Sequence, residues 1–192
     1  AIISSDIGNN CAIGNAYPSF EEGRKYLAPG LFGPCGYGLP AVIGAKIGCP
    51  DAPVVGFSGD GAFGIAVNEL TAIGREEWPA VTQIVFRNYQ WGAEKRNSTL
   101  WFDDNFVGTE LDTDVSYAGI ANACGLKGVV ARTMDELTEA LDQAVRDQKA
   151  GTTTLIEAMI NQELGEPFRR DAMKNPVEVA GISAKDMRPQ DV

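Results

Sequence analysis

Short runs of apolar residues recur along the chain, and each is bounded by glycine, proline or polar residues. Runs with this length and these boundaries are typical of strands buried on both faces of a sheet. We expect strands at residues 2–5, 53–57, 80–86, 128–131 and 152–160. Because these runs alternate with helical patterns, the sequence predicts an α/β fold with three layers, α/β/α, around a mostly parallel central sheet.

Helical patterns fill most of the spaces between these strands. Residues 35–47 are small and apolar, as in a closely packed helix, and another helix is expected to begin at Ala62. Its apolar face would consist of Ile65, Leu70 and Ile73. Residues 6–34 are rich in glycine, asparagine and proline, so we expect a loop there. Residues 89–113 form a polar, aromatic segment that is too long for a simple connection, which favours a functional role.

The C-terminal half predicts a helix over residues 115–124 and another that begins after Thr133. Thr133 followed three residues later by Glu136 is the sequence pattern of a helix N-cap. The apolar face of this helix would consist of Leu137, Leu141, Ala144 and Val145. Beyond it the pattern fades. We therefore expect one domain over residues 1–165 and a tail over residues 166–192 that wraps a partner domain or is partly disordered.

Length, composition and charge narrow the class of protein. The 192 residues are 44% hydrophobic, which suits one globular domain with a sizeable core. The net charge of −10 makes nucleic acid and anionic membranes unsuitable partners. No apolar stretch reaches the roughly 18 residues of a membrane span. The chain begins with Ala1 instead of Met, so we expect it to be a fragment of a longer protein.

The cysteines have no close spacing of the kind that binds zinc, and the chain has no histidine to complete such a site. Free thiols in the cytoplasm are the simplest interpretation. The cysteines are Cys11, Cys35, Cys49 and Cys124.

A glycine turn follows the second long strand and carries the candidate chemistry. Gly59 and Gly61 flank Asp60, and Asn88 follows the next strand, 28 positions later (88 − 60). Glycine lets the backbone approach a ligand closely, and a carboxylate suits magnesium or calcium. The start of the following helix would favour an anion such as a diphosphate. An ordinary turn and an ordinary strand end are the alternative interpretation.

The Gly-Asp-Gly turn with its later Asn resembles the thiamine-diphosphate motif of the superfamily that contains acetolactate synthase and pyruvate decarboxylase. The resemblance implies thiamine diphosphate and Mg2+ as cofactors. It also implies that the metal ligands are the side chains of Asp60 and Asn88 and the main-chain carbonyl of Gln90. That family often has Asn where this chain has Arg87. The cofactor-binding residues implied in this region are Gly59, Asp60, Gly61, Ala62, Asn88, Gln90, Trp91 and Gly92.

The resemblance extends upstream of the glycine turn. Residues 29–41 resemble the glycine-rich loop that holds the aminopyrimidine ring of the cofactor. The Gly33 carbonyl would then accept a hydrogen bond from the exocyclic amine. Cys35 would stand in place of the apolar side chain that bends the cofactor, although the family commonly has Met, Ile or Leu there. Asn9 and Asn10 would reach the diphosphate, where Gln and His are frequent.

A narrower likeness covers residues 75–81, 86–97 and 100–111, which resemble the family of sulfoacetaldehyde acetyltransferases. This likeness implies an acyltransferase that converts sulfoacetaldehyde and phosphate to acetyl phosphate and sulfite. It also implies that the activating glutamate comes from an N-terminal pyrimidine-binding domain of a second subunit. The partners would then be that domain and subunit in a homo-oligomer, and the isolated chain would be inactive.

Two other functions are compatible with the same motifs. One is an acetolactate synthase or 2-keto acid decarboxylase domain, and the other is a non-catalytic module with the same fold. Several basic residues are candidates for binding phosphate or a sulfonate, because guanidinium and ammonium groups pair with oxyanions. They are Arg24, Lys25, Arg87, Lys95 and Arg96.

Overall fold

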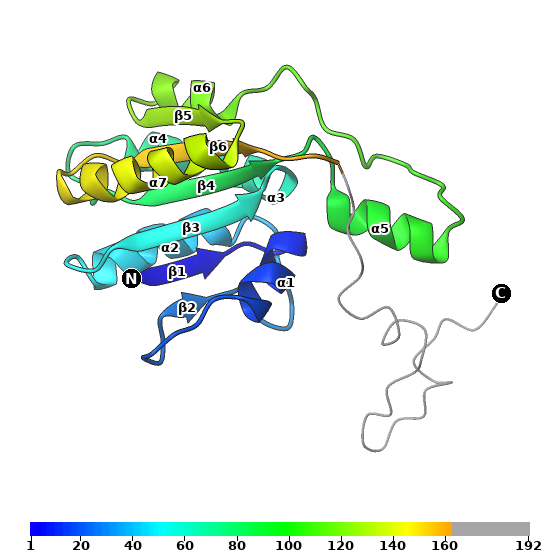
Figure 1. Ribbon diagram of the computed structural model, residues 1–192, viewed down its shortest axis with the longest axis horizontal. Helices are drawn as coiled ribbons and strands as arrows, with labels where there is room; N and C mark the ends of the chain where they lie inside the picture. The colour runs from blue at the N-terminus through cyan, green and yellow to red at the C-terminus, as the bar shows by residue number, and fades with distance from the viewer. Residues whose placement is uncertain (163–192) are drawn as a thin grey trace. The chain divides into compact units, whose positions relative to one another are not determined.

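The computed structural model describes residues 1–162, which form one compact unit (Figure 1). The predicted tail over residues 166–192 lies outside the described residues, so the division of the chain at residue 165 stays a prediction. Among residues 1–162, no helix has both the length and the apolar character needed to cross a lipid bilayer.

A six-stranded sheet forms the middle layer, in the order β2-β1-β3-β4-β6-β5. Every neighbouring pair is parallel. This arrangement confirms the predicted α/β/α fold, and the five expected strands are present with ends displaced by two residues or fewer. The strands are β1 (Ile2–Ser5), β2 (Tyr26–Leu27), β3 (Val54–Gly59), β4 (Thr82–Arg87), β5 (Lys127–Ala131) and β6 (Thr154–Met159).

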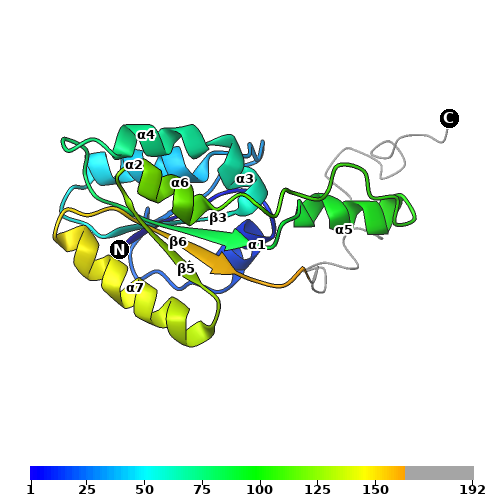
Figure 2. The same ribbon diagram turned by 90° about the horizontal axis from the view of Figure 1, so that it is seen from above.

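Helices cover both faces of this sheet (Figure 2). The register pairs Phe57 with Ile84 and Ile84 with Ile156, so these three side chains share one face. Helix α1 approaches Phe57 through Gly14, and α7 packs against Ile156. The other face is covered by α2, α3, α4 and α6. The helices are α1 (Asn9–Ala16), α2 (Gly38–Gly48), α3 (Asp60–Ile65), the 3-10 helix η1 (Val67–Glu69), α4 (Leu70–Ile73), α5 (Gly92–Trp101), α6 (Tyr117–Ala123) and α7 (Met134–Lys149).

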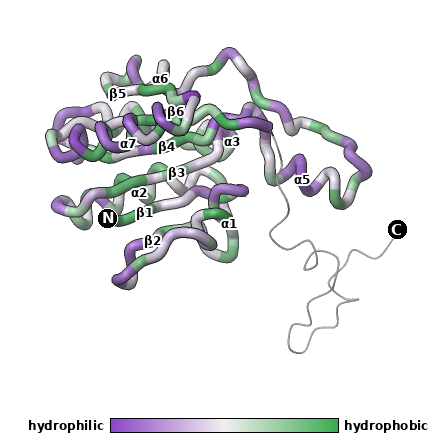
Figure 3. The backbone as a smooth tube through the Cα atoms, viewed as in Figure 1, coloured by the Kyte–Doolittle hydropathy of each residue, from purple (hydrophilic) through white to green (hydrophobic). Residues whose placement is uncertain are grey.

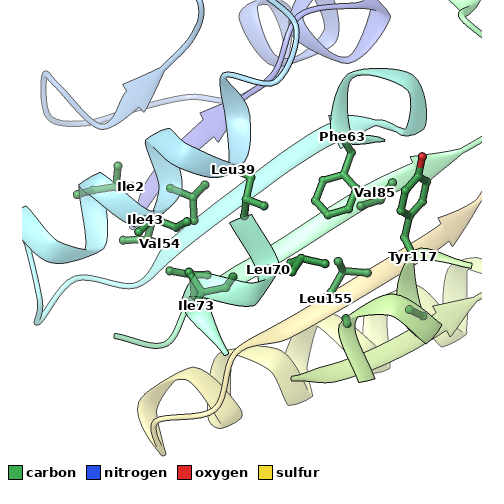
Figure 4. Close-up of a cluster of buried hydrophobic side chains, with 14 residues drawn as sticks. Ile2, Leu39, Ile43, Val54, Phe63, Leu70, Ile73, Val85, Tyr117 and Leu155 are labelled. Atoms are coloured by element: carbon green, nitrogen blue, oxygen red, sulfur yellow. The ribbon is translucent and has the colours of Figure 1, made fainter. Parts of the chain in front are cut away.

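The main hydrophobic core lies between the sheet and the helices α2, α3, α4 and α6 (Figure 4). Leu39 of α2, Phe63 of α3 and Leu155 of β6 are fully buried there. Phe63 also contacts Tyr117 of α6 edge-on, with ring centroids 5.1 Å apart. Burying a side chain of this size stabilises the fold by about 1.5–3 kcal/mol. The core therefore fixes α3 against β3 and β4, and α6 against β5 and β6.

The predicted loop over residues 6–34 is wrong in part, because α1 and the short strand β2 lie within it. Helix α1 has no stripe of large apolar residues, and its buried positions are Asn10, Cys11 and Gly14. Close packing of Gly14 on Phe57 holds it to the sheet, and periodicity cannot reveal a contact of this kind. The two residues of β2 are too few to give a strand pattern.

The helix predicted to begin at Ala62 begins two residues earlier, at Asp60, and it is not continuous. It breaks at Ala66, where φ is −106° and ψ is 11°, and passes through η1 before α4. Ile65, expected on the apolar face, is 56% exposed. Gly61 and Gly64 are weak helix formers, which is consistent with a short first segment.

The helix expected to begin after Thr133 is α7, and its cap is confirmed. The Glu136 amide donates to Thr133 Oγ1 at 3.1 Å, and Glu136 Oε2 accepts from the Arg132 amide at 2.6 Å. Ala144 is fully buried as expected, whereas Val145 is 40% exposed, so its place on the apolar face is wrong. The face of α7 that packs against the sheet is therefore narrower than the apolar face predicted from the sequence.

The predicted functional segment over residues 89–113 contains α5, a helix that the sequence pattern did not show. It extends beyond the end of the sheet (Figures 1 and 2). None of its residues is buried, and most of them are hydrophilic (Figure 3). A helix without a buried face has no hydrophobic periodicity to detect.

Strand β1 lies beside β3 in the sheet. The chain leaves β1 and β3 toward opposite faces. After β1 the chain enters α1 on one face of the sheet, and after β3 it enters α3 on the other face. Such a topological switch point, at the carboxyl ends of the strands, is where open parallel α/β sheets bind ligands. The fold therefore singles out the ends of β1 and β3 as the candidate site.

Candidate cofactor site

The Asp60 carboxylate lies at the carboxyl end of β3 and is 1% exposed. Its Oδ2 accepts hydrogen bonds from the amides of Tyr89, at 2.7 Å, and Asn88, at 3.1 Å. Oδ2 also accepts from Arg87 Nη1 at 3.2 Å. Among the described residues, its Oδ1 accepts only from the Gly61 amide, at 3.0 Å. One carboxylate oxygen is thus saturated by β4 and the turn after it, while the other keeps a lone pair for a ligand.

Two opposing effects act on the protonation of Asp60. Burial raises the pKa of its carboxyl group, and the Tyr89 amide, Arg87 and the Asn88 amide oppose that rise. Hydrogen bonds and a nearby cation favour the charged form that a metal ligand requires.

Two glycines bring the chain close to other groups of the site. A Cβ atom placed on Gly61 would lie 2.7 Å from the Trp91 ring. A Cβ atom on Gly92 would lie 3.2 Å from Asn9 Nδ2, 3.6 Å from Asn88 Nδ2 and 3.7 Å from Gln90 Nε2. The loop after β1 and the turn after β4 therefore meet at Gly92. The structure brings these predicted cofactor-binding residues together at the carboxyl edge of the sheet, although β3 lies between β1 and β4.

Gln90 is held by both ends of its side chain. Its Oε1 accepts from Lys95 Nζ at 3.1 Å, and its Nε2 donates to the Gln162 carbonyl at 2.9 Å. Lys95 also forms an ion pair with Glu110. The side-chain amide of Gln90 is thus engaged within the chain, which fits the expectation that only its main-chain carbonyl would meet a metal. Lys95, a candidate for anion binding, is already paired.

Asp6, which follows β1, attaches the glycine-rich loop to the sheet. It is fully buried, and its Oδ1 accepts from the Gly36 amide at 3.1 Å while its Oδ2 accepts from the Gly38 amide at 2.8 Å. Gly33 has φ +57°, a left-handed conformation that suits glycine. Cys35 is exposed, and partial desolvation, with the nearby Asp6 and Glu94 carboxylates, raises the pKa of its thiol. Asp6 thereby sets the position of the two loop residues predicted to hold the aminopyrimidine.

Asn10 is buried next to the glycine turn. Its Nδ2 donates to the Asp6 carbonyl at 2.8 Å and to Ser5 Oγ at 3.2 Å. Its Oδ1 would lie 3.4 Å from a Cβ atom on Gly59. The amide group therefore fixes the start of α1 and also borders the turn that carries Asp60.

Arg24 and Lys25 do not reach this site. They precede β2, and the Lys25 carbonyl accepts from the Ile3 amide near the amino end of β1, whereas the site lies at the carboxyl edge. Lys25 Nζ pairs with Glu22 at 3.4 Å. Arg87 is 1% exposed and engaged inside the protein, so its predicted contact with a phosphate or sulfonate is not what the structure shows.

Three residues around Asp60 were not identified from the sequence as a group. Besides its contact with Asp60, Arg87 Nε lies 3.6 Å from Glu157 Oε1, and the Tyr117 hydroxyl donates to the Asp60 carbonyl at 2.9 Å. One signal in the sequence was Arg87, a charged residue directly after the strand predicted over residues 80–86. Glu157 inside the last apolar strand is a second such position, but no pattern links the two.

No group of three or more His, Cys, Asp or Glu side chains within residues 1–162 is arranged to hold a metal ion. The ligand set expected here differs from such a group, because it contains one carboxylate, one side-chain amide and one main-chain carbonyl. All of its atoms are hard oxygens, which suit Mg2+.

The fold and this set of polar residues define a protein that binds a cofactor at the edge of a parallel sheet. Residues 6–158 match the family model described as "Thiamine pyrophosphate enzyme, C-terminal TPP binding domain". The chain belongs to this family.

Relatives and a solved structure agree with this assignment. The chain is 91% identical over its full length to a sulfoacetaldehyde acetyltransferase of Roseovarius nubinhibens and 82% identical over 99% of its length to one of Rhodobacter capsulatus. It spans 32% of the length of each of these relatives. The fold also resembles a thiamine diphosphate-dependent 4-hydroxybenzoylformate decarboxylase of Rhodococcus jostii RHA1. The TM-score is 0.72 and the identity 23%, over 86% of this chain and 30% of that one. This last likeness concerns the fold alone.

Proposed function

We propose that the chain is the cofactor-binding domain of a thiamine diphosphate-dependent acetyltransferase that acts on sulfoacetaldehyde and phosphate. The geometry of Asp60 is the observation that carries the proposal. Within residues 1–162 its Oδ1 has a single donor, the Gly61 amide, while Oδ2 accepts from the Asn88 amide, at the switch point of a sheet whose family binds this cofactor. The narrower choice of substrate is supported by relatives that are 91% and 82% identical and are named for sulfoacetaldehyde.

The residues present fit a magnesium ion and a diphosphate. Asp60 Oδ1, the Asn88 side chain and the Gln90 carbonyl would supply the ligands, and phosphate oxygens complete such sites. Gly59, Gly61 and Gly92 allow the backbone and its amides to approach, because side chains there would meet Asn10, Trp91 and Asn9. Ala62 is buried beside Gly61, and its small side chain takes up little space at the start of α3.

The bound cofactor would supply a thiazolium carbon that adds to the carbonyl group of the substrate. The role of this chain is to bind and orient the group. Asp60 and Asn88 hold the metal, Gly33 and Cys35 lie on the loop that would meet the aminopyrimidine, and Trp91 lies over Gly61. No residue of the chain is assigned to proton transfer, and we propose that the activating glutamate is supplied by another domain.

That other domain would be an N-terminal pyrimidine-binding domain in a second subunit, which implies a homo-oligomer. Two large apolar side chains near the site support a partner surface, since Leu31 and Phe32 are 109% and 96% exposed. A cytoplasmic location is supported by the four cysteines, all of which are free thiols, as expected in a reducing compartment.

Calorimetry of thiamine diphosphate binding with and without Mg2+ tests the cofactor site. We expect weak, Mg2+-dependent binding to the chain and none to Asp60→Ala. Asp60→Asn, which keeps the size of the side chain, should also bind more weakly. Asp51→Ala is the matched control, because Asp51 is exposed in the turn before β3, at the opposite edge of the sheet. Equal binding by Asp60→Ala and wild type would contradict the assignment.

An assay of the full-length protein tests the substrate. Sulfoacetaldehyde with phosphate should give acetyl phosphate and sulfite, whereas pyruvate should give little acetolactate or acetaldehyde. The opposite preference would assign the chain to the acetolactate synthase or 2-keto acid decarboxylase class. Binding of the cofactor without turnover of either substrate would favour the non-catalytic module.

A further inference from the structure

We propose that Arg87 is a positioning residue of the metal site, which orients the Asp60 carboxylate and couples it to Glu157 and the start of α6. This inference rests on the proposed function, because it assigns a role toward the proposed metal ligand. Arg87 is the largest fully buried side chain among the described residues. A buried cation is costly unless it is paired and hydrogen-bonded, so its partners indicate what it does.

The three nitrogens of the Arg87 guanidinium group face three different sets of partners. Nη1 donates to Asp60 Oδ2 at 3.2 Å, while Nη2 donates to the Asp112 and Val115 carbonyls at 2.5 Å and 2.9 Å. Nε makes no hydrogen bond within the described part of the chain but lies 3.6 Å from Glu157 Oε1. Only a planar group with donors on several edges can make these contacts together, which Lys cannot do.

Aromatic rings fix the plane of the guanidinium group. Its central carbon lies 4.2 Å from the centroid of the Tyr89 ring and 5.1 Å from that of the Tyr117 ring. Both rings thus contribute cation–π attraction in a desolvated place. Arg87 has little freedom to rotate, so the position of Nη1 relative to Asp60 is fixed.

The contacts of Arg87, together with those of two amides, decide which oxygen of Asp60 is available. With Nη1 and two amides on Oδ2, that oxygen has no lone pair left for a metal. Oδ1 retains one, because the Gly61 amide is its single donor within residues 1–162. Without the guanidinium group, the carboxylate would be held only by main-chain amides and could rotate. Arg87 therefore presents Oδ1 in a single orientation.

The same group links the metal site to α6. Glu157 Oε1 faces Arg87, and its Oε2 accepts from Ser116 Oγ at 2.9 Å and from the Ala118 amide at 3.0 Å. These donors belong to the cap and the first turn of α6. The three charges lie on β4, on β6 and at the end of β3, which are neighbours in the sheet. The segment between α5 and α6 is held by the same guanidinium through Asp112 and Val115.

The test compares Mg2+ affinity with thermal stability in the full-length protein. The probe is Mg2+ titrated in the presence of thiamine diphosphate and followed by calorimetry. Arg87→Lys and Arg87→Met should weaken Mg2+ binding by about 10–100-fold, as changes to residues that support metal ligands do. Arg87→Met should also lower the melting temperature, because Glu157 is left buried without its counter-charge.

A double variant separates positioning from folding. Arg87→Met with Glu157→Gln removes the charges of both residues, so the melting temperature should recover in part, because only Asp60 then lacks its counter-charge, while Mg2+ affinity stays low. Thr153→Ala is the matched control: it removes a buried hydrogen bond from the Val81 amide, before the amino end of β4, and leaves the contacts of Arg87 and Asp60 intact. Its Mg2+ affinity should stay within about twofold of wild type, a margin similar to the error of such comparisons.

Two results would overturn the proposal. One is Mg2+ affinity that stays near the wild-type value in Arg87→Lys and in the double variant. The other is affinity that recovers together with the melting temperature in the double variant, which would show a purely structural role. Failure of the proposed function would look different, since the wild-type protein itself would then show no Mg2+-dependent binding of thiamine diphosphate.

Discussion

Close approach between main chain and side chain sets the geometry of the site at the scale of single residues. The Trp91 ring packs on Gly61, and the Asn9, Asn88 and Gln90 amides gather around Gly92. A Cβ atom on Gly61 would clash with the Trp91 ring, and one on Gly92 would make a tight contact with Asn9. The lack of side chains at Gly61 and Gly92 therefore contributes to the shape of the site, as the Asp60 carboxylate contributes to its chemistry.

We predict that Gly61→Ala weakens thiamine diphosphate binding and lowers the free energy of unfolding by about 1–3 kcal/mol, the usual cost of overpacking. A Cβ atom there would lie 2.7 Å from the Trp91 ring, which has to move. Calorimetry and urea denaturation measure the two effects. Gly44→Ala in α2 is the control: no atom lies within 4 Å of its Cβ position, so stability should rise by about 0.5–1 kcal/mol. A neutral Gly61→Ala would show that Trp91 is free to shift.

At the scale of elements, helices are attached to the sheet by specific end contacts as well as by apolar faces. Thr133 and Ser116 cap α7 and α6 with side-chain oxygens. Near the other end of α7, Gln148 Oε1 accepts from the Val54 amide at 2.9 Å, and its Nε2 donates to Thr82 Oγ1 at 3.0 Å. These contacts fix the positions of α6 and α7 along the strands.

We predict that Thr133→Ala destabilises the chain by about 1 kcal/mol, because the Glu136 amide loses its acceptor. Thr138→Ala is the matched control. Thr138 is exposed in the middle of α7, and its hydroxyl bonds only the Met134 carbonyl, so the change should stay within about 0.5 kcal/mol. Urea denaturation of both variants measures the difference. Equal effects would mean that the cap contributes nothing beyond the loss of a hydroxyl.

A pH dependence of stability is expected from the pair formed by Lys127 of β5 and Asp147 of α7. The hydrogen bond from Lys127, followed by that from Gln143, lowers the pKa of Asp147 in the folded chain. A lowered pKa stabilises the fold above the pKa of the unfolded state, and this stabilisation is lost as pH falls through the folded value. The difference in unfolding free energy between wild type and Asp147→Asn should therefore shrink as the solution is acidified. A constant difference from neutral to acidic pH would contradict the role of this pair.

At the scale of the whole molecule, the order of the strands places the site. The chain leaves β1 and β3 toward opposite faces, so residues that follow them meet at one edge of the sheet. The chain also spans 32% of the length of its relatives, and it has exposed apolar residues on the loop beside the site. Both features are consistent with a site that another domain completes.

We predict that the isolated chain binds the cofactor but forms no acetyl phosphate from sulfoacetaldehyde and phosphate. The physical reason is that the proposed function assigns the glutamate that activates the aminopyrimidine to another domain. Product formation by the isolated chain and by the full-length protein can be compared at equal concentrations. Robust turnover by the isolated chain would show that the site is complete without a partner.

The fold class and part of the site could be predicted because they depend on local patterns. The apolar runs at β1, β3, β4, β5 and β6 are strands in the structure, and Thr133 caps α7 as its spacing indicated. Helices α1 and α5 were missed because they bury no stripe of large apolar side chains. The place of Asp60 after a buried strand could be predicted, but the hydrogen-bond donors on each of its oxygens could not.

The sequence by itself determined the order of five strands and of helices α2, α3, α6 and α7, the glycine turn around Asp60 and the family to which the chain belongs, since each depends on patterns along the chain. The tertiary structure alone decided that Arg87 is buried between Asp60 and Glu157 instead of facing a ligand. Glu157 lies 70 positions after Arg87 (157 − 87). The partners of a charged residue are set by which strands lie side by side, and the order of strands in a sheet is not the order of strands in the chain.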